Sequence, residues 1–584
     1  MREIKYGKIL IDPQINPAIL DTATWDIQTI KGVVIKNEPD VWKKIIEENL
    51  NAEYDKFKCG GIIFYLGSSS INNDCLYMLL EYPDRQHSIL TISNNKIEDE
   101  IGEPFWSYKN EKACLTFYKA DINTLHNYFL KIDKKRGPRA LGYTSRLGIG
   151  TRMSTVMWPA IYDSMQSLGQ PSNTIQNSLR ELRLLSDVLN GEKPKSIHLY
   201  SFGYIEEGHT GSTFEGLWLE GVLYALKRKD VAPYGADADH IKVDNCYEGI
   251  KRAKKIVDAA QYYTFYTIDV SNIIKYEYMM SNFKGRGEEA FKKINLNKEE
   301  IEKLYRYHEK TFLYNGVKII IDKDILSRFL GKYWEALNAL EELDEYITKI
   351  KKSEKYDLEL SIDEFPGNFK IKEVLTRPEE VLLLIREFQR RNLHITHLAP
   401  NFGVEKGVDY RMPGGLEELG KRIQLFYRIC QKEGVMLDCH SGDDLSSKTR
   451  KTFSHATEGN LHFKISPSLQ EIFAEALFDE CPASFGRWWQ KTLEYAKEQA
   501  SKGSAFAQEC IDKYYKDEKS ISYKNMFFHY YYYAPIGKYD KYGRLELRDM
   551  FYSLPQYFYK KYNNLLKKRL TLLCNDLYKS RERR

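Results

Sequence analysis

The sequence predicts an α/β protein built on a TIM-type (β/α)8 barrel. After residue 140, short runs with strand character recur eight times, and segments with helical spacing separate most of them. Strands that alternate with helices form parallel sheets, and about eight such units close into a barrel. We expect strands within 141–150, 173–178, 231–240, 263–271, 357–365, 393–402, 435–442 and 461–468.

The helices are predicted from the spacing of apolar residues. The stretch "CYEGIKRAKKIVDAAQ" (246–261) follows the third expected strand. In "YWEALNALEELDEYITKI" (333–350), the apolar positions follow one helical face. This second stretch belongs to an insertion, residues 272–355, that is oversized for one barrel connection and is expected to be helical.

Segments on either side complete the predicted domain organisation. Residues 1–135 read as an N-terminal mixed α/β extension, with strands at 60–70 and 75–82 and a helix at 40–50. Residues 136–484 form the barrel with its insertion. Residues 485–584 are helical and rich in tyrosine ("FFHYYYYAP"), which favours a C-terminal helical cap whose tyrosines pack against one another.

Composition excludes several classes of protein. Nine cysteines are scattered singly without a CxxC pair, which is typical of reduced thiols in a cytosolic protein. The N-terminus "MREIKYGKILIDPQ" has no apolar targeting segment, and no run reaches the roughly 18 apolar residues of a membrane span. A net charge of +5 over 584 residues does not favour nucleic-acid binding. We therefore expect a cytoplasmic protein with a small-molecule partner, no nucleic acid and no membrane; a homo-oligomer is compatible with the sequence.

Polar residues alternate with apolar ones along three of the expected strands. In "DLELSIDE", for example, Glu359 and Asp363 share the face opposite Leu360. Because helices surround a barrel, the apolar face points outward and the polar face points into the lumen, where Val, Ile and Leu are usual. Charged groups there are costly unless they bind one another, a metal or a substrate. The expected inward sets are Glu359, Ser361 and Asp363; Met436, Asp438 and His440; and His462, Lys464 and Ser466.

Two histidines are candidates for metal binding at one rim of the barrel. Asp239 and His240 end the third expected strand, and His440 ends the seventh. Barrel enzymes keep their chemistry at the carboxyl ends of the strands, and imidazoles beside carboxylates suit Zn²⁺ or Mn²⁺. From spacing alone the alternative stays open, in which His240 caps a helix and His440 is a hydrogen-bonded core residue.

Residues from about 140 to 480 resemble the tagaturonate epimerase family. The resemblance rests on ordered runs that together span more than half the chain: "GADADH", "FYTIDVS", "LELSIDE", "EKGVDY", "CHSGDD" and "HFK". The extension 1–135 lies outside it. The stretches 190–215 and 272–355 are longer than the family pattern requires, and His397 stands where another residue is expected. These differences lie in or near loops that shape specificity.

The resemblance implies a metal-dependent epimerase that acts on keto-hexuronates. Carried over by position, Asp239 is the proton acceptor, Glu359 is the proton donor, and His240 and His440 are metal ligands. The motifs leave a further ligand open among Asp363, Asp269, Glu405 and His397, with Asp363 favoured. The implied cofactor is one divalent cation, Zn²⁺, Mn²⁺, Co²⁺ or Ni²⁺.

The proposed chemistry follows from the carbon that is inverted. D-Tagaturonate and D-fructuronate differ at the carbon β to the ketone, so removal of an α proton does not invert it. Retro-aldol cleavage, rotation of the aldehyde and re-addition would do so. This route needs a base, an acid and a Lewis acid.

The substrate's carboxylate also needs a cation. Lys464 is the first choice, and Arg146, Arg152 and Lys242 are alternatives. Gln176 and Arg180 are expected on a helix surface rather than at the barrel mouth. "RLGIGTRMS" lacks the lysine and spacing of a phosphate-binding loop.

Two other classes of function stay open on the sequence. An aldose–ketose isomerase or an aldolase on the same barrel would differ in the carbonyl position or the carbon count of its product. A non-catalytic sugar-binding barrel would not need the set Asp239, His240, Glu359 and His440.

Overall fold

The computed structural model covers most of the chain. It describes residues 4–6, 9–11, 27–36, 55–83, 85–93, 101–109, 114–151, 154–199, 203–244, 247–314, 316–366, 369–405, 408–440, 442–538, 540–542 and 544–578. The helix expected at 40–50 lies outside these residues, as does Arg152.

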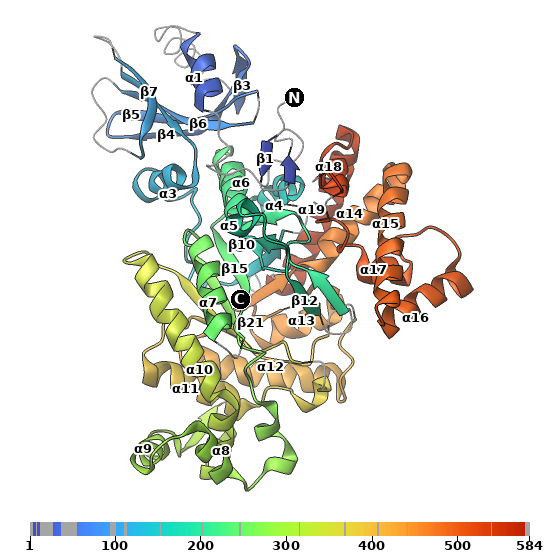
Figure 1. Cartoon of the computed structure of the whole chain (residues 1–584). Coiled ribbons are helices and arrows are strands. Elements are labelled where there is room, and N and C mark those ends of the chain that lie inside the picture. The colour runs from blue at the N-terminus through green and yellow to red at the C-terminus, as the bar shows by residue number, and fades with distance from the viewer. Residues whose placement is uncertain are drawn as a thin grey trace.

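Eight parallel strands close into a barrel at the centre of the molecule (Figure 1). Each one overlaps a stretch where the sequence predicts a strand, so the predicted barrel is confirmed. Neighbours follow chain order, and β22 pairs with β9 to close the ring. The strands are β9 (Arg146–Gly150), β10 (Ser172–Asn177), β15 (Tyr234–Lys242), β16 (Phe265–Asp269), β19 (Asp357–Ser361), β20 (His397–Ala399), β21 (Met436–Cys439) and β22 (His462–Ile465).

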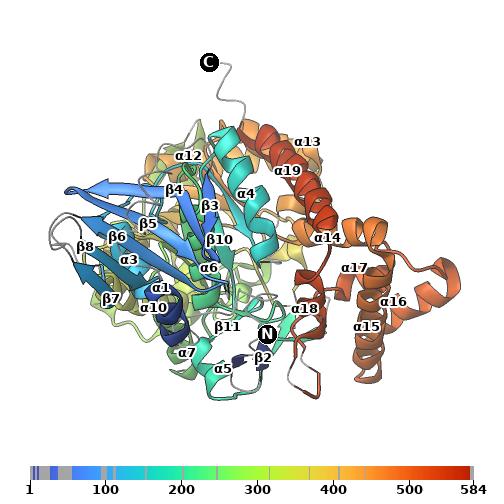
Figure 2. The ribbon, with the colours of Figure 1, turned by 90° about the horizontal axis from the view of Figure 1, so that it is seen from above.

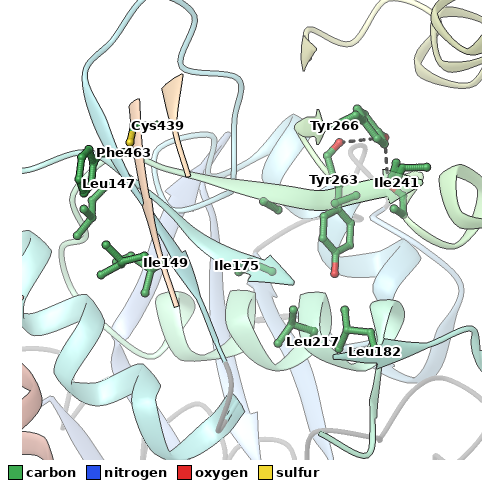
Figure 3. Packing of buried hydrophobic residues seen from close by; sticks show 14 of the residues in the cluster. Leu147, Ile149, Ile175, Leu182, Leu217, Ile241, Tyr263, Tyr266, Cys439 and Phe463 are labelled. Atoms are coloured by element: carbon green, nitrogen blue, oxygen red, sulfur yellow. Dashed lines mark hydrogen bonds between the residues drawn. The ribbon is translucent and has the colours of Figure 1, made fainter. Parts of the chain in front are cut away.

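Helices cover the outside of the barrel and bury the apolar face of each strand. Ile175 of β10 lies so close to Gly221 that a Cβ there would approach its side chain to 2.6 Å. Figure 3 shows Ile175 above the helix that carries Leu217, and Phe463 beside Leu147. The outward apolar face is therefore as predicted. The surrounding helices are α4 (Ser154–Leu168), α6 (Phe214–Leu226), α7 (Tyr247–Ala259), α10 (Lys323–Lys351), α11 (Pro378–Arg391), α12 (Gly415–Lys432), α13 (Ser447–Ala456) and α14 (Pro467–Glu480).

Two connections between barrel strands are enlarged. The β10–β15 connection contains an antiparallel hairpin, β12 (Ser196–Leu199) with β13 (Gly203–Glu206). The β16–β19 connection contains α8 (Gly287–Ile294), α9 (Lys298–His308) and the long helix α10, which Figure 1 shows on the side away from the N-terminal sheet. It also contains a hairpin, β17 (Thr311–Tyr314) with β18 (Val317–Ile320). The insertion was predicted to be helical, and it is mainly helical but includes this hairpin.

An antiparallel sheet and a helix precede the barrel. The sheet runs in the order β3-β4-β5-β6-β8-β7, and the helix α3 (Ile122–Lys131) leads from it towards the barrel (Figures 1 and 2). Lys227 at the end of α6 pairs with Glu81 of the sheet, which ties the two parts together. The strands are β3 (Lys56–Cys59), β4 (Ile62–Asn72), β5 (Cys75–Glu81), β6 (His87–Ser93), β7 (Pro104–Lys109) and β8 (Cys114–Lys119).

The C-terminal part is helical and aromatic. Trp488 packs edge-on against Phe528, and Phe527, Phe528 and Tyr531 are buried, so the aromatic run forms a core. The last helix lies against α4, α13 and α14 on the flank of the barrel (Figure 2). The three-part division of the chain stays a prediction, and its boundary at 484 falls inside a helix. The helices are α15 (Pro482–Ser501), α16 (Ala505–Lys513), α17 (Met526–Tyr531), α18 (Glu546–Tyr552) and α19 (Gln556–Tyr578).

No helix in the described part of the chain is both long enough and apolar enough to cross a lipid bilayer.

Candidate active site

A buried ammonium group on β22 joins carboxyl groups from two other strands, β15 and β19, in the barrel lumen. Lys464 Nζ lies 2.9 Å from Asp239 Oδ1, 3.1 Å from Asp237 Oδ2 and 3.1 Å from Glu359 Oε1. It also donates a hydrogen bond to Thr267 Oγ1 at 2.7 Å. Because the ammonium neutralises several carboxylates, their burial is tolerated. The inward polar face predicted from alternation is therefore real.

Small residues on β9 make room for this cluster. A Cβ on Gly148 would come within 2.5 Å of Gln176 Oε1 and 2.8 Å of Lys464 Cγ. The glycines of "RLGIG" therefore belong to a strand and leave space in the lumen. Gln176 is itself on β10 and points inward, so its expected place on a helix surface is wrong.

Asp438 and His462 lie beside Glu359 and complete the buried set. His462 Nδ1 is 2.7 Å from Asp438 Oδ2 and 3.9 Å from Glu359 Oε2. The short contact lacks hydrogen-bond geometry, and both carboxylate oxygens of Asp438 and both ring nitrogens of His462 are buried without a hydrogen bond among the described residues. The contact is therefore an electrostatic one between groups that another ligand, water or ion could still bind.

His240 adopts a left-handed backbone conformation at the rim. Its φ is +43°, and the pairing of β15 with β16 shifts register between Ala238 and Ile241. Such a bulge re-aims a side chain, and a positive φ in a residue other than glycine stores strain that clusters at functional sites. The bulge brings His240 to 4.9 Å from the His440 ring, centroid to centroid.

Three rim residues present donor atoms that fit a divalent cation. Nitrogen atoms of His240 and His440 and an oxygen of Asp363 all lie within 4.8 Å of one another. His440 Nδ1 is buried, lies 3.1 Å from Asp363 Oδ1 and has no hydrogen bond in the described structure. Two imidazoles with a carboxylate are a donor set used for Zn²⁺ and similar metals. These residues therefore fit the metal that the sequence predicts.

Asp269 belongs to an overlapping set. Its Oδ2 is 3.3 Å from His240 Nδ1, and Asp269, Glu364 and His240 also form a group of potential ligands. The other two candidates from the sequence lie elsewhere. Glu405 pairs with Arg411, and His397 contacts Arg146 Nη2 at 3.1 Å, next to the Arg146–Asp357 ion pair.

Electrostatics divide the carboxyl groups of the lumen into two kinds. Burial, followed by the Asp438 carboxylate, raises the pKa of Glu359 to about 8. Burial likewise raises the pKa of Asp237 to about 7. Burial also opposes ionisation of Asp239, but the Lys464 ammonium together with His240 and His440 outweighs it, so the pKa of Asp239 lies below its usual range. Close neighbours around one cation therefore differ in protonation.

The pKa values of His440 at the rim and His462 in the lumen are also shifted in opposite directions. Burial disfavours the charged form of His440, but Asp363 and Glu359 together outweigh it and raise the pKa of His440 well above its usual value. Burial lowers the pKa of His462 to about 4.

Other polar residues lie at the edge of this site or away from it. Arg180 pairs with Glu364 at 3.0 Å beyond β10, so its expected place on a helix surface is also wrong. His529 pairs with Glu471 of α14 at 3.1 Å. Asp237 was missed by the sequence analysis, although "ADADH" puts it on the same strand face as Asp239.

A closed parallel barrel with acidic, basic and imidazole groups gathered in its lumen and at the carboxyl ends of its strands defines a TIM-barrel enzyme. The family model described as tagaturonate epimerase (UxaE) matches residues 201–500, which is half of the chain. The chain belongs to this family and is an epimerase of the isomerase class.

Solved structures agree on the fold. Fructuronate-tagaturonate epimerase UxaE from Cohnella laeviribosi, in its complex with one glycerol, has a TM-score of 0.63 and 19% identity, covering 92% of this chain and 99% of that one. The native form of that enzyme has a TM-score of 0.63 and 18% identity, with the same coverage of both chains. The complex with two glycerols has a TM-score of 0.62 and 19% identity. No curated protein matches the chain.

Proposed function

We propose that the protein is a divalent-metal-dependent epimerase that interconverts D-tagaturonate and D-fructuronate by retro-aldol cleavage and re-addition. Membership of the tagaturonate epimerase family supports the reaction class, and the name of the Cohnella laeviribosi enzyme supports the substrate pair. The observation that carries the proposal is the contact of Asp239 and Glu359 with one ammonium nitrogen, beside the donor group His240, His440 and Asp363.

His240, His440 and Asp363 are the proposed metal ligands, and Asp269 is the alternative to Asp363. A divalent cation bound there, such as Zn²⁺, Mn²⁺, Co²⁺ or Ni²⁺, would supply a Lewis acid for negative charge on substrate oxygens. His440 also contacts Glu359, at 2.9 Å between Nε2 and Oε1. The proposed metal ligands and the proposed acid therefore adjoin.

Asp239 is the proposed base. It accepts the proton from the hydroxyl on the carbon to be inverted. The bond from that carbon towards the ketone then breaks, its electron pair moves into the ketone to give an enediolate, and the inverted carbon becomes an aldehyde.

Glu359 is the proposed acid. After the aldehyde rotates, the enediolate attacks its opposite face, the ketone re-forms, and Glu359 gives its proton to the new alkoxide. Lys464 Nζ contacts both carboxyl groups, so the charge lost by Asp239 and the charge gained by Glu359 fall beside the same cation. Positioned proton transfer of this kind contributes about 10²–10⁴-fold to rate.

Elemental analysis of the purified protein and an NMR assay with each uronate test the proposal. We expect close to one divalent metal per chain, loss of activity on chelation, and recovery on adding metal back. Each uronate should yield the other, with carbon count and ketone position unchanged. Release of two smaller fragments would instead identify an aldolase, and migration of the carbonyl would identify an aldose–ketose isomerase.

A further inference from the structure

The substrates of the proposed function are uronates, which carry a carboxylate. The site therefore needs a cation that this carboxylate can reach. Lys464, the first choice from the sequence, is almost fully buried and already contacts Asp237, Asp239 and Glu359. A further carboxylate at this ammonium would have to displace one of these contacts, and an ionised neighbour would repel it. The surroundings of Lys464 favour a role in holding the acid and the base.

Arg146 is equally occupied. Its Nη1 lies 2.8 Å from Asp357 Oδ2, and it is fully buried at the first residue of β9, the end of the barrel opposite the rim. Substrate reaches a TIM barrel from the carboxyl ends of the strands. Arg146 is therefore on the wrong side of the lumen.

Among the described residues, Arg180 and Lys242 are cations at the rim, and one carboxylate bridges them. Glu364, three residues beyond β19, places Oε1 at 3.0 Å from Arg180 Nη1 and Oε2 at 2.9 Å from Lys242 Nζ. The side chains of Arg180 and Lys242 are 12% and 29% exposed, whereas that of Lys464 is 4% exposed. Each oxygen of one carboxylate thus has its own cation, in the arrangement that a bound carboxylate ligand requires.

This pair adjoins the proposed reaction centre. Lys242 Nζ is 3.7 Å from Asp269 Oδ2, which in turn is 3.3 Å from His240 Nδ1. Ser178 Oγ accepts a hydrogen bond from Arg180 Nε at 3.3 Å, which helps to fix the guanidinium over the rim. A six-carbon ligand with one end at His240 and His440 would have its other end near these cations.

We propose that Arg180 and Lys242 bind the carboxylate of the uronate, and that Glu364 occupies this position in the free protein and is displaced by the substrate. The inference rests on the proposed function and assigns the selectivity for sugar acids over neutral sugars to the rim. Glu364 then acts as an internal competitor, since it holds the two cations in place and must give up its contacts for substrate to bind.

Steady-state kinetics of the metal-loaded enzyme on each uronate and on the matching neutral ketose test this assignment. The neutral ketose carries a hydroxymethyl group in place of the carboxylate. Arg180→Met and Lys242→Met should each raise KM for the uronate about tenfold to a hundredfold, the loss expected for one charge-assisted hydrogen bond. KM for the neutral ketose should change by less than twofold. Glu364→Gln should lower KM for the uronate, because it removes the competing charge.

Lys254→Met is the matched control, since Lys254 forms a similar ion pair with Glu342 on the outer helices. It should leave both KM values unchanged. Metal content and the thermal midpoint show whether each variant is intact, and if either rim variant fails to fold, Glu364→Gln provides an independent readout.

The outcomes distinguish a wrong assignment of the rim residues from a wrong proposed function. Equal rises of KM on both sugars, or no change of KM in Glu364→Gln and in the rim variants, would overturn the rim assignment and leave the epimerase intact. If Lys464→Met instead retained turnover and it alone raised KM selectively for the uronate, the carboxylate would bind at Lys464. Absence of epimerisation of the uronates by the unaltered enzyme would overturn the proposed function itself.

Discussion

Asp239 and Glu359 come from different strands of the barrel and contact the same nitrogen atom, Lys464 Nζ, at 2.9 and 3.1 Å. Their environments nevertheless push their protonation in opposite directions, since burial and Asp438 raise the pKa of Glu359 to about 8 whereas the pKa of Asp239 is lowered. A pair of carboxyl groups separated in this way can supply one base and one acid at the same pH.

Asp239→Asn and Glu359→Gln test this division of roles. Each substitution keeps the shape of the side chain and removes its ability to transfer a proton. We expect kcat to fall by about 10²–10⁴-fold in both variants, with metal content unchanged. Kinetics with metal analysis measure both quantities, and a variant that keeps more than a tenth of the original kcat would exclude its residue from proton transfer.

His240→Ala and His440→Ala test the metal site. Because both imidazoles are proposed to bind the cation directly, each variant should lose tight metal binding and activity together. His394→Ala is the control, since His394 is exposed and pairs with Asp344. Retention of full metal content in either rim variant would show that the cation binds elsewhere.

Lys464→Met tests whether the ammonium organises the lumen. Asp237, Asp239 and Glu359 would lose their shared cation, and leaving the ionised Asp239 buried without its partner typically costs about 3–5 kcal/mol. We expect the urea midpoint to fall clearly and turnover to be lost, whereas Lys254→Met should change neither. An unchanged midpoint would mean that Asp239 is neutral or otherwise compensated.

The retro-aldol route predicts the fate of hydrogen at the inverted carbon. That hydrogen stays on its carbon while the neighbouring carbon–carbon bond breaks and re-forms. Epimerisation in D₂O should therefore invert the centre without placing deuterium on it, as NMR of the product would show. Stoichiometric deuterium at the inverted carbon would exclude this mechanism.

Glu220 predicts a pH dependence of stability outside the site. Burial raises its pKa from 4.5 to about 7. Because the folded pKa exceeds the unfolded one, the favourable contribution of the neutral form is full below pH 4.5 and is lost as the pH rises through about 7.

The shift corresponds to about 3 kcal/mol in the free energy of unfolding. Glu220→Gln stays neutral, so its stability relative to the unaltered protein should be greater at pH 8 than at pH 5 by about this amount. Urea unfolding at the two pH values measures the difference. An equal effect at both would show that Glu220 does not ionise in this range.

The barrel could be predicted because its signals are local. Each strand carries its own alternation, as in Glu359, Leu360 and Ser361, and the outward apolar residues needed only the assumption that helices surround the sheet. Asp239 and His240 were candidates because they end an expected strand, and Glu359 because it alternates with apolar residues inside one; their roles came from the family resemblance.

Contacts between distant segments could not be predicted from local sequence patterns. Nothing near Lys464 in the sequence indicates that its ammonium meets Asp237 and Asp239, more than 200 positions earlier. The placement of Arg180 and Gln176 was wrong for the same reason, since the closing of the barrel turns β10 and the loop after it towards the lumen and the rim.

The sequence alone therefore determined the fold class, the order of the strands and the chemical types of the side chains that face the lumen, because periodicity and residue type act over a few neighbouring positions. Only the tertiary structure decided which of these groups meet. The left-handed backbone at His240 that brings it to His440, and the bridge of Glu364 between Arg180 and Lys242, depend on ring closure and strand register. These features join residues far apart in the chain, and no local pattern encodes such distances.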